Sequence, residues 1–376
     1  MALMVGRRTI LFAGGKTGGH LFPGVAVAEE LLRREPELEI AFCGAGFELP
    51  RRVCGERGWD YHFIPAAPIY QASPLKLVSG LLTNLRGVRG ARRLLLRLRP
   101  ELLVVCGGFE GFPPALAARW YGVPVVLLEQ NARPGLTNRA LAPFAEAAAC
   151  AFPGSGARLA ARRVVVTGNP VRGGLASFEP DYSAFGLERD RLTGLVFGGS
   201  AGAKSINEAV GEAAPLLAEF SNVQWIIQTG AAMRDEVARA VEDAGLRAHV
   251  TAFLDPIGAA FALADFAVAR SGGGAFELAL VGIPSVFVPY PHAAADHQSA
   301  NARAFAAAGG AVVVRDDELN GERLIAAVSP LIDDAGLRRR MGRAMRKLGR
   351  PDAARRAAEL ILSVIDDAAR AVGAAC

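Results

Sequence analysis

The chain repeats one local pattern in its two halves: an apolar run, then a glycine-rich turn, then a helical segment. The first turn is GGKTGG at residues 14–19, and the second is GGSAGA at residues 198–203. Glycine lets the backbone approach a phosphate closely, and the helix that follows supplies unpaired N–H groups and the positive end of its dipole. Each turn therefore suits a diphosphate, or else serves only as a tight connection between a strand and a helix. In both cases the pattern predicts two α/β units.

Strand-like and helical segments alternate along the rest of the chain. The expected strands are apolar throughout, which is typical of parallel strands covered by helices on both faces. Such alternation predicts doubly wound α/β sheets. Strands are expected at residues 9–13, 39–43, 102–106, 125–128, 192–197, 223–229, 249–252, 266–269 and 285–288, and helices at residues 22–34, 113–121 and 353–369 and from about residue 203.

We predict two Rossmann-like domains that face a cleft. The first spans residues 1–168 and the second spans residues 169–350. Residues 351–376 are expected to form a helix that packs back on the first domain. Ligands of open α/β sheets bind at the carboxyl ends of the strands, so both glycine turns are expected to face the cleft.

Composition excludes several classes of protein. With 51% hydrophobic and 21% charged residues, the chain is expected to fold. A net charge of +5 fits phosphate-bearing ligands or an acidic membrane surface, but it is weak for nucleic acid, and no zinc-finger pattern is present. The 5 cysteines form no C-x-x-C pair, which suits a reducing compartment. With no signal peptide and no run of about 18 apolar residues, we expect a cytoplasmic protein.

Two glycine-containing motifs carry candidate functional side chains. His20 belongs to GGKTGGHLFPG, on the expected loop, with Pro23 placed for the first turn of the helix. Histidine titrates near neutral pH, so His20 suits a base or a phosphate ligand, or else a capping residue. Glu277 belongs to RSGGGAFELALVGIP at residues 270–284 and lies near a helix start. Its carboxylate suits the two hydroxyls of a ribose, or else it interacts with the helix dipole.

A third motif, PYPHAAADHQSANAR at residues 289–303, is rich in polar side chains. It contains His292, Asp296, His297 and Gln298. The two histidines are five residues apart, which matches no metal-binding pattern such as H-E-x-x-H, so no metal is expected. Contacts from Asp296 and Gln298 to sugar hydroxyls are the favoured interpretation.

Residues 76–99 combine basic charge with an apolar face. The segment has no acidic residue, and leucines and valines alternate with its basic residues. Such a helix lies on an anionic membrane, or else it covers the sheet with its leucines and exposes its arginines to solvent. Both interpretations stay open. The basic residues are Lys76, Arg86, Arg89, Arg92, Arg93, Arg97 and Arg99.

Taken together and in order, these motifs resemble the MurG family of bacterial cell-wall synthesis. Besides the motifs above, the resemblance includes GGFEGFPPALAA from residue 107, LEQNARPGLTNRAL from residue 128, TGNPVR from residue 167 and GGSAGAKSIN from residue 198. It implies a GT-B-type glycosyltransferase. The implied donor is UDP-N-acetylglucosamine, and the implied acceptor is the muramyl-pentapeptide carried on undecaprenyl diphosphate. It also implies a peripheral protein on the cytoplasmic face of the plasma membrane, bound to anionic lipid through residues 76–99.

The resemblance also implies roles for individual residues. In the first half, Thr17, Gly18 and Gly19 line the cleft near the donor sugar and the acceptor diphosphate, His20 is the catalytic candidate, and Asn131 contacts the N-acetylglucosamine. In the second half, Arg172 and Ser200 bind the nucleotide diphosphate, and Leu254 meets the uracil through its backbone. The remaining substrate contacts are Gly273, Gly274, Ala275 and Phe276 at the start of the helix, Glu277 on the ribose and Gln298 on sugar hydroxyls.

The implied reaction inverts the anomeric centre. The 4-hydroxyl of the acceptor attacks, a base takes its proton, and UDP leaves from the opposite face. A helix N-terminus and Arg172 stabilise the charge that grows on UDP, so no metal cofactor is expected.

Two other classes of function stay open from the residues alone. The first is a related enzyme, either a glycosyltransferase with another acceptor or a UDP-sugar epimerase, because a fold does not fix a function. The second is a non-catalytic UDP-sugar-binding scaffold. Lys16, Leu128, Ala201 and residues 272–276 depart from the usual residues of the MurG family and motivate it. A hydride-transferring enzyme is disfavoured, because neither turn reads G-x-G-x-x-G.

Overall fold

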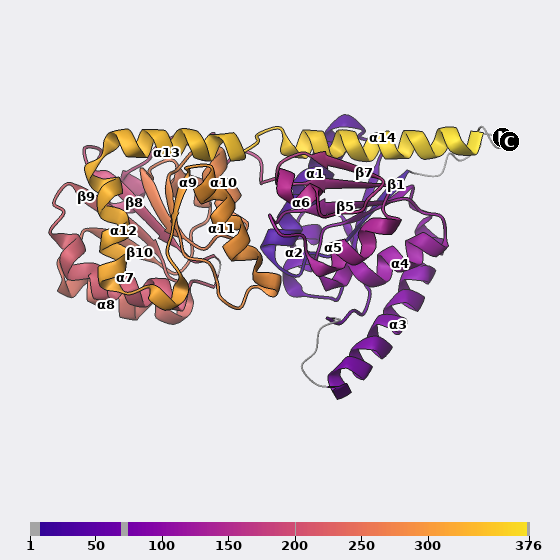
Figure 1. Cartoon of the computed structure of the whole chain (residues 1–376), viewed down its shortest axis with the longest axis horizontal. Coiled ribbons are helices and arrows are strands. Elements are labelled where there is room, and N and C mark those ends of the chain that lie inside the picture. Colours follow the sequence, from indigo (N-terminus) through magenta and orange to yellow (C-terminus); the bar gives the residue numbers. More distant parts are fainter. Residues whose placement is uncertain (1–7, 69–73, 200, 374–376) are drawn as a thin grey trace. The chain divides into compact units, whose positions relative to one another are not determined.

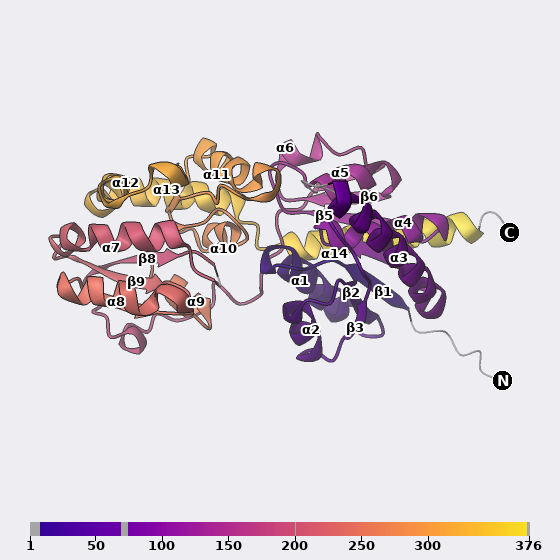
Figure 2. The same cartoon turned by 90° about the horizontal axis from the view of Figure 1, so that it is seen from below.

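A computed structural model describes residues 8–68, 74–199 and 201–373 of the chain. The chain divides into two compact units, each built around one parallel sheet (Figures 1 and 2). Unit 1 comprises Met1–Arg172 and Pro351–Cys376, and unit 2 comprises Gly173–Arg350. The two Rossmann-like sheets expected from the alternation of strands and helices are therefore present.

The sheet of unit 1 has seven strands in the order β3-β2-β1-β4-β5-β6-β7, and all neighbours are parallel. The chain runs outward from β1 to β3 and then returns to the other side of β1 with β4. The sheet therefore has a switch point between β1 and β4. The strands are β1 (Thr9–Ala13), β2 (Glu39–Gly44), β3 (Asp60–Phe63), β4 (Leu102–Val105), β5 (Val125–Glu129), β6 (Ala147–Cys150) and β7 (Arg163–Val166).

Helices cover both faces of this sheet, because successive side chains of a strand point to opposite faces. Ile10 and Phe12 pack in one core with α1 and α14, whereas Leu11 and Ala13 pack in another with α3 and α4. The helices of unit 1 are α1 (Gly18–Arg34), α2 (Glu48–Gly55), α3 (Pro74–Leu98), α4 (Phe112–Trp120), α5 (Leu136–Leu141), α6 (Pro153–Gly156) and α14 (Ala353–Gly373).

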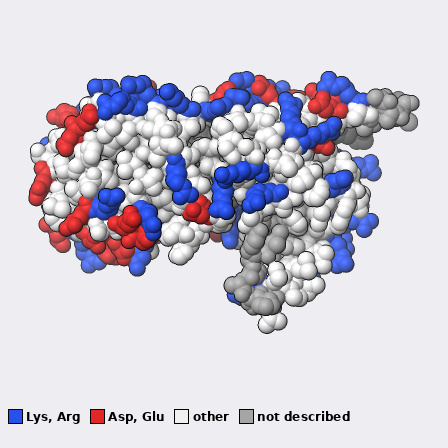
Figure 3. Space-filling view, viewed as in Figure 1, with Lys and Arg blue, Asp and Glu red and all other residues white. Residues whose placement is uncertain are grey.

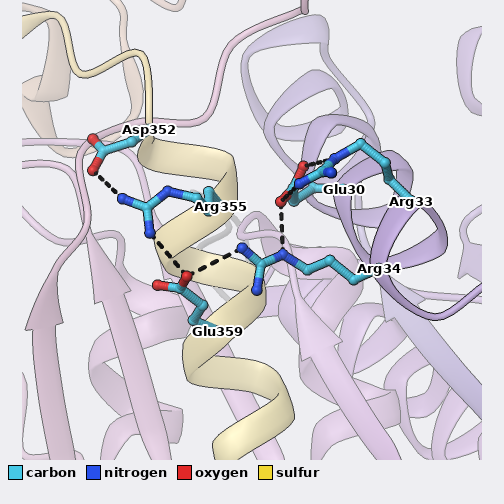
Figure 4. Close-up of polar contacts among 6 residues, drawn as sticks. All are labelled: Glu30, Arg33, Arg34, Asp352, Arg355 and Glu359. Atoms are coloured by element: carbon cyan, nitrogen blue, oxygen red, sulfur yellow. Dashed lines mark hydrogen bonds and ion pairs between the residues drawn. The ribbon is translucent and has the colours of Figure 1, made fainter.

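Helix α14 returns from the end of the chain to pack against α1. Its buried residues Ala357, Ile361 and Ile365 join the core that contains Ile10 and Phe12. At the surface a chain of ion pairs links the two helices (Figure 4), running from Arg33 and Glu30 through Arg34 to Glu359 and Arg355. The last segment of the chain therefore belongs to the fold of unit 1.

Unit 2 repeats the arrangement with six parallel strands in the order β10-β9-β8-β11-β12-β13. Its switch point lies between β8 and β11, and Trp225 and Phe266 stack edge to face within its core. The strands are β8 (Leu192–Phe197), β9 (Val223–Gln228), β10 (Ala248–Thr251), β11 (Phe266–Ala269), β12 (Ser285–Phe287) and β13 (Ala311–Val313). The helices are α7 (Lys204–Ala218), α8 (Arg234–Asp243), α9 (Ile257–Phe261), α10 (Gly274–Val281), α11 (His297–Ala307), α12 (Gly321–Asp333) and α13 (Ala335–Leu348).

The first glycine turn is shorter than expected. Helix α1 begins at Gly18, so His20 lies in its first turn rather than on a loop, and Pro23 lies inside the helix rather than in its first turn. The helix starts early because Thr17 caps it in an extended conformation, after which Gly18 and Gly19 adopt helical geometry. The expectation for Pro23 was wrong.

Residues 76–98 form most of α3, a helix of 25 residues, and Arg99 follows its end. Among residues 8–68, 74–199 and 201–373, no helix is both long and apolar enough to cross a membrane.

Candidate functional site

The switch point of unit 1 brings together the loops that follow β1 and β4. Gly14 follows β1 with a φ of 110°, and a Cβ added to it would lie 2.6 Å from the carbonyl oxygen of Gly107, which follows β4. Only glycine allows this approach and this conformation. The crevice outside the carboxyl ends of the strands at a switch point is where open α/β sheets bind ligands.

The start of α1 lies at this switch point. Thr17 caps α1 without a side-chain hydrogen bond to the helix backbone, and its Oγ1 lies 3.3 Å from Nδ1 of His20. The imidazole ring packs beside Gly107, where an added Cβ would lie 2.9 Å from Cδ2 of His20. Thr17, His20 and the helix start with Gly18 and Gly19 therefore lie together in unit 1.

Asn131 is held by a buried carboxylate that the sequence did not single out. Glu129 is 2% exposed, and its Oε1 accepts hydrogen bonds from N and Nδ2 of Asn131, at 2.9 and 3.2 Å. Its Oε2 accepts from N of Gly135 and Nδ2 of Asn138, both at 2.9 Å. Burial raises the pKa of Glu129, and these hydrogen bonds oppose that rise. Glu129 therefore orients the loop that carries Asn131.

Arg172 lies with unit 1. Its guanidinium carbon is 4.9 Å from the centroid of the Phe22 ring on α1, a cation–π contact. The predicted domain boundary at residues 168–169 assigned Arg172 to the second domain, whereas the structure divides the chain between Arg172 and Gly173.

The second glycine turn lies at the switch point of unit 2, between β8 and the start of α7. Gly202 has a φ of 76°, and a Cβ there would lie 1.8 Å from the carbonyl oxygen of Thr229, so this turn packs tightly on the loop after β9. The predicted phosphate ligand Ser200 lies outside the described residues.

Glu277 lies in the first turn of α10 and is half-buried, with Gly273 as the N-cap of this helix. Ala275 and Phe276 are buried, and the ring of Phe276 contacts Phe305 of α11 edge to face. The side chains of Ala275 and Phe276 therefore belong to the core. Four of the predicted contacts therefore offer a ligand mainly backbone groups. They are Gly273, Gly274, Ala275 and Phe276.

A network around Arg270 joins several loops at the carboxyl edge of the sheet in unit 2. Its guanidinium bonds the carbonyl oxygen of Val288 at 3.1 Å, Oγ of Ser205 at 3.0 Å and the carboxylate of Asp316. Ser205 Oγ in turn donates to Asp316 Oδ1 at 2.6 Å. The sequence placed Arg270 in a motif but did not pair it, because Ser205 and Asp316 are 65 and 46 residues away.

Gln298 lies on α11 beside the loop after β12, and its Oε1 accepts from N of Tyr290 at 3.0 Å. Asp296 precedes this helix and pairs with Arg303 at 3.5 Å. Leu254, the predicted backbone contact to the uracil, is buried, with 8% of its surface exposed. Within the described residues, no three His, Cys, Asp or Glu side chains gather as a metal site requires.

These features define a class of protein. Each unit is a doubly wound parallel sheet with a glycine-rich turn and a helix start at its switch point. Doubly wound sheets of this kind bind nucleotide-containing ligands outside the carboxyl ends of their strands, at the switch point.

Comparisons with known proteins give the family. Residues 10–150 match the glycosyltransferase family 28 N-terminal domain, and residues 193–357 match the C-terminal domain of the same family. A relative from Halothermothrix orenii is 35% identical over 96% of this chain and 99% of its own. One from Geobacter sulfurreducens is 39% identical over 92% of this chain and 95% of its own. Both are named UDP-N-acetylglucosamine–N-acetylmuramyl-(pentapeptide) pyrophosphoryl-undecaprenol N-acetylglucosamine transferase.

Among solved structures, the crystal structure of Acinetobacter baumannii MurG superimposes with a TM-score of 0.76 at 28% identity, covering 95% of this chain and 99% of that one. The chain therefore belongs to glycosyltransferase family 28 and, within it, to the MurG family.

Proposed function

We propose that this protein transfers N-acetylglucosamine from UDP-N-acetylglucosamine to the 4-hydroxyl of the muramyl-pentapeptide on undecaprenyl diphosphate, the step that forms lipid II. It is a UDP-N-acetylglucosamine-dependent hexosyltransferase. The observation that carries the proposal is the identity of 35–39% to transferases of this name over more than nine-tenths of both chains. This sequence identity extends over nearly the whole chain, which includes both switch points and both glycine turns.

The donor is proposed to bind unit 2. The start of α7 offers N–H groups and a positive dipole end to its diphosphate, and Arg172 and Ser200 remain its proposed side-chain ligands. The half-buried carboxylate of Glu277 suits the ribose hydroxyls, and the backbone at Leu254 suits the uracil. Gln298, beside the loop after β12, is proposed to bind the sugar hydroxyls.

The acceptor is proposed to bind at the switch point of unit 1. Its 4-hydroxyl oxygen forms a bond to C1 of N-acetylglucosamine as the bond from C1 to the UDP oxygen breaks, and the hydroxyl proton passes to a base. His20 is the proposed base, since its ring lies at this switch point with Nδ1 near the Thr17 hydroxyl. Asn131, oriented by Glu129, is the proposed contact to the N-acetylglucosamine.

We further propose that the chemical step needs no metal ion. The leaving UDP carries away the negative charge of the broken bond, and fixed dipoles at a helix start together with an arginine stabilise such charge. In the motif with His292 and His297, Nδ1 of His297 lies 2.7 Å from the carbonyl oxygen of Ala294, and sugar contacts from this motif remain the proposal.

The membrane surface is the proposed location. The first half of α3 exposes apolar side chains, of which Leu75 is 83% and Leu81 61% exposed. In Figure 3 the surface over α3 consists of uncharged residues, drawn white, and of Lys and Arg, drawn blue. All charged residues from 76 to 99 are basic. Apolar and basic groups together favour an anionic bilayer, so we place the protein as a peripheral protein on the cytoplasmic face of the plasma membrane.

The product of the reaction tests this proposal. Purified protein, UDP-N-acetylglucosamine and the muramyl-pentapeptide lipid diphosphate should yield free UDP and a lipid-linked disaccharide with an inverted, β-configured linkage, detected by mass spectrometry and NMR. A UDP-sugar isomer without lipid product would instead support an epimerase.

A further inference from the structure

A buried carboxylate ties together three loops at the switch point of unit 1. Glu110 follows β4 and is 1% exposed. Its Oε2 accepts a hydrogen bond from N of Lys16 at 2.7 Å, and its Oε1 accepts one from N of Ala45 at 2.8 Å. These partners follow β1 and β2, so one side chain joins the ends of three neighbouring strands. Burying a carboxylate costs free energy unless such hydrogen bonds satisfy it.

Lys16 carries an exposed ammonium beside this carboxylate. Its Nζ lies 4.9 Å from the ring centroid of Phe47 and 5.7 Å from that of Phe109, on the loops after β2 and β4. No carboxylate of the described residues forms an ion pair with Lys16. The aromatic rings hold the ammonium at the carboxyl edge of the sheet, where a phosphate group can still reach it.

A buried side-chain oxygen at the same switch point has no hydrogen-bond partner among the described residues. Gln130 is 6% exposed, and its Nε2 donates to the carbonyl oxygen of Cys106 at 3.0 Å, yet its Oε1 has no hydrogen-bond partner. The gap beside this oxygen is small: a Cβ on Gly107 would lie 3.3 Å from Gln130 Oε1 and 3.3 Å from His20 Nε2. Buried polar atoms are nearly always paired, so this oxygen is an unsatisfied acceptor at the switch point, next to the proposed base.

We propose that Lys16 binds the diphosphate of the acceptor lipid, and that Glu110 is the positioning residue that holds Lys16 at the switch point of unit 1. The inference rests on the proposed function, in which each substrate contains a diphosphate and each unit opens with a strand, a glycine turn and a helix. The donor diphosphate is assigned to the turn in unit 2, so the turn that contains Lys16 is left for the acceptor. Lys16 adds a full positive charge to a turn that otherwise offers backbone groups and the Thr17 hydroxyl.

Steady-state kinetics with a short-chain, water-soluble muramyl lipid diphosphate tests the role of Lys16. Lys16→Met should raise the KM for this acceptor about tenfold or more, as expected for loss of a charge-assisted hydrogen bond, and leave the donor KM unchanged. Lys16→Arg should retain most of the affinity. Lys347→Met, an exposed lysine on α13, is the matched control and should behave as the wild type.

Salt dependence separates a phosphate contact from a packing role. The ratio of acceptor KM between Lys16→Met and the wild type should shrink as the salt concentration rises, because screening weakens the wild-type contact. Glu110→Gln should raise the acceptor KM by a smaller factor and in the same salt-dependent way. An unchanged acceptor KM in Lys16→Met, or an equal rise in the donor KM, would overturn the proposal.

A binding measurement keeps this test independent of turnover. Calorimetry with farnesyl diphosphate should show binding to the wild type and a weaker affinity for Lys16→Met, with equal melting temperatures. If the wild type binds this probe but transfers no sugar, the proposed function fails while the role of Lys16 stands. Equal affinity for both proteins, or no binding to either, would overturn the role of Lys16.

Discussion

His20 and Glu277 lie at the two switch points and should fail in different ways. Replacing His20 by alanine removes the proposed base and should lower kcat by about two to four orders of magnitude, the usual contribution of general base catalysis. Replacing Glu277 by alanine should mainly raise the KM for UDP-N-acetylglucosamine, because the ribose loses its acceptor. Initial rates over both substrate concentrations separate these effects, and if neither variant differs from wild type, the site is misplaced.

Glu129 shows how much a single buried side chain organises in unit 1. In Glu129→Gln, one of the two carboxylate oxygens becomes an NH2 group, which accepts no hydrogen bond. The donors left without an acceptor are then those of Asn131 on one side, or those of Gly135 and Asn138 on the other. Leaving buried donors unpaired costs about 1–3 kcal/mol each, partly offset by removal of a buried charge. We expect a lower free energy of unfolding by urea denaturation and a reduced rate of transfer. Wild-type stability with a wild-type rate would contradict this role.

At the scale of elements, α3 should govern attachment to membranes. Changing Leu81 and Leu82 together to glutamate places two negative charges on the exposed apolar face, where the leucines are 61% and 52% exposed. Each leucine side chain buried in lipid contributes about 1.5–3 kcal/mol, so sedimentation with anionic phospholipid vesicles should fall to background.

The control for α3 is Leu216→Glu on α7, which alters a leucine that is 41% exposed in unit 2. This variant should sediment with vesicles as the wild type does. Equal binding by the α3 variant and the wild type would favour the other interpretation of this segment, an amphipathic helix that only covers the sheet.

The contact between α1 and α14 should be sensitive to acid. Hydrogen bonds from Arg33 lower the pKa of Glu30 to about 2, with burial opposing the shift and Arg34 adding to it. Because the folded pKa is below the ordinary value of 4.5, the stabilisation is present above pH 4.5 and is lost as the pH falls toward 2. Glu30→Gln should have a lower free energy of unfolding than the wild type at pH 7. Denaturant titrations should show this difference shrinking as the pH falls below 4.5.

A matched variant, Glu56→Gln, removes a carboxylate that is 58% exposed and 3.7 Å from Arg52. Its stability should stay near that of wild type at both pH values, since exposed pairs contribute little. If the difference in free energy of unfolding between Glu30→Gln and the wild type does not change with pH, the ion-pair explanation is contradicted.

For the whole molecule, most central strands and the edge strand β10 could be predicted, whereas the alanine-rich β6 and the edge strands β3, β7 and β13 could not. Strands such as β1 and β8 are continuous apolar runs, and the structure has them at the expected residues. By contrast, β3 has the sequence DYHF and β7 the sequence RVVV, and both lie at the edge of the sheet with exposed residues. Edge strands are covered on fewer sides and therefore lack the signal that identifies central strands.

The site was predictable where a motif is local and not where it depends on distant contacts. Thr17, His20 and Glu277 follow from glycine turns and helix starts that are visible in the sequence. Glu110 was not predicted, because its partner Lys16 is 94 residues away and only the neighbouring positions of β1 and β4 bring them together. The pairing of Arg270 with Asp316 was missed for the same reason.

The central claim is transfer of N-acetylglucosamine to a lipid diphosphate, and one measurement tests it most directly. Purified protein is given labelled UDP-N-acetylglucosamine and a synthetic muramyl-pentapeptide lipid diphosphate, with and without EDTA, and label in the lipid is counted over time. We predict label in the lipid at equal initial rates in both samples. UDP-N-acetylglucosamine that binds by calorimetry without any label reaching the lipid would contradict the claim, and transfer abolished by EDTA would contradict the metal-free step.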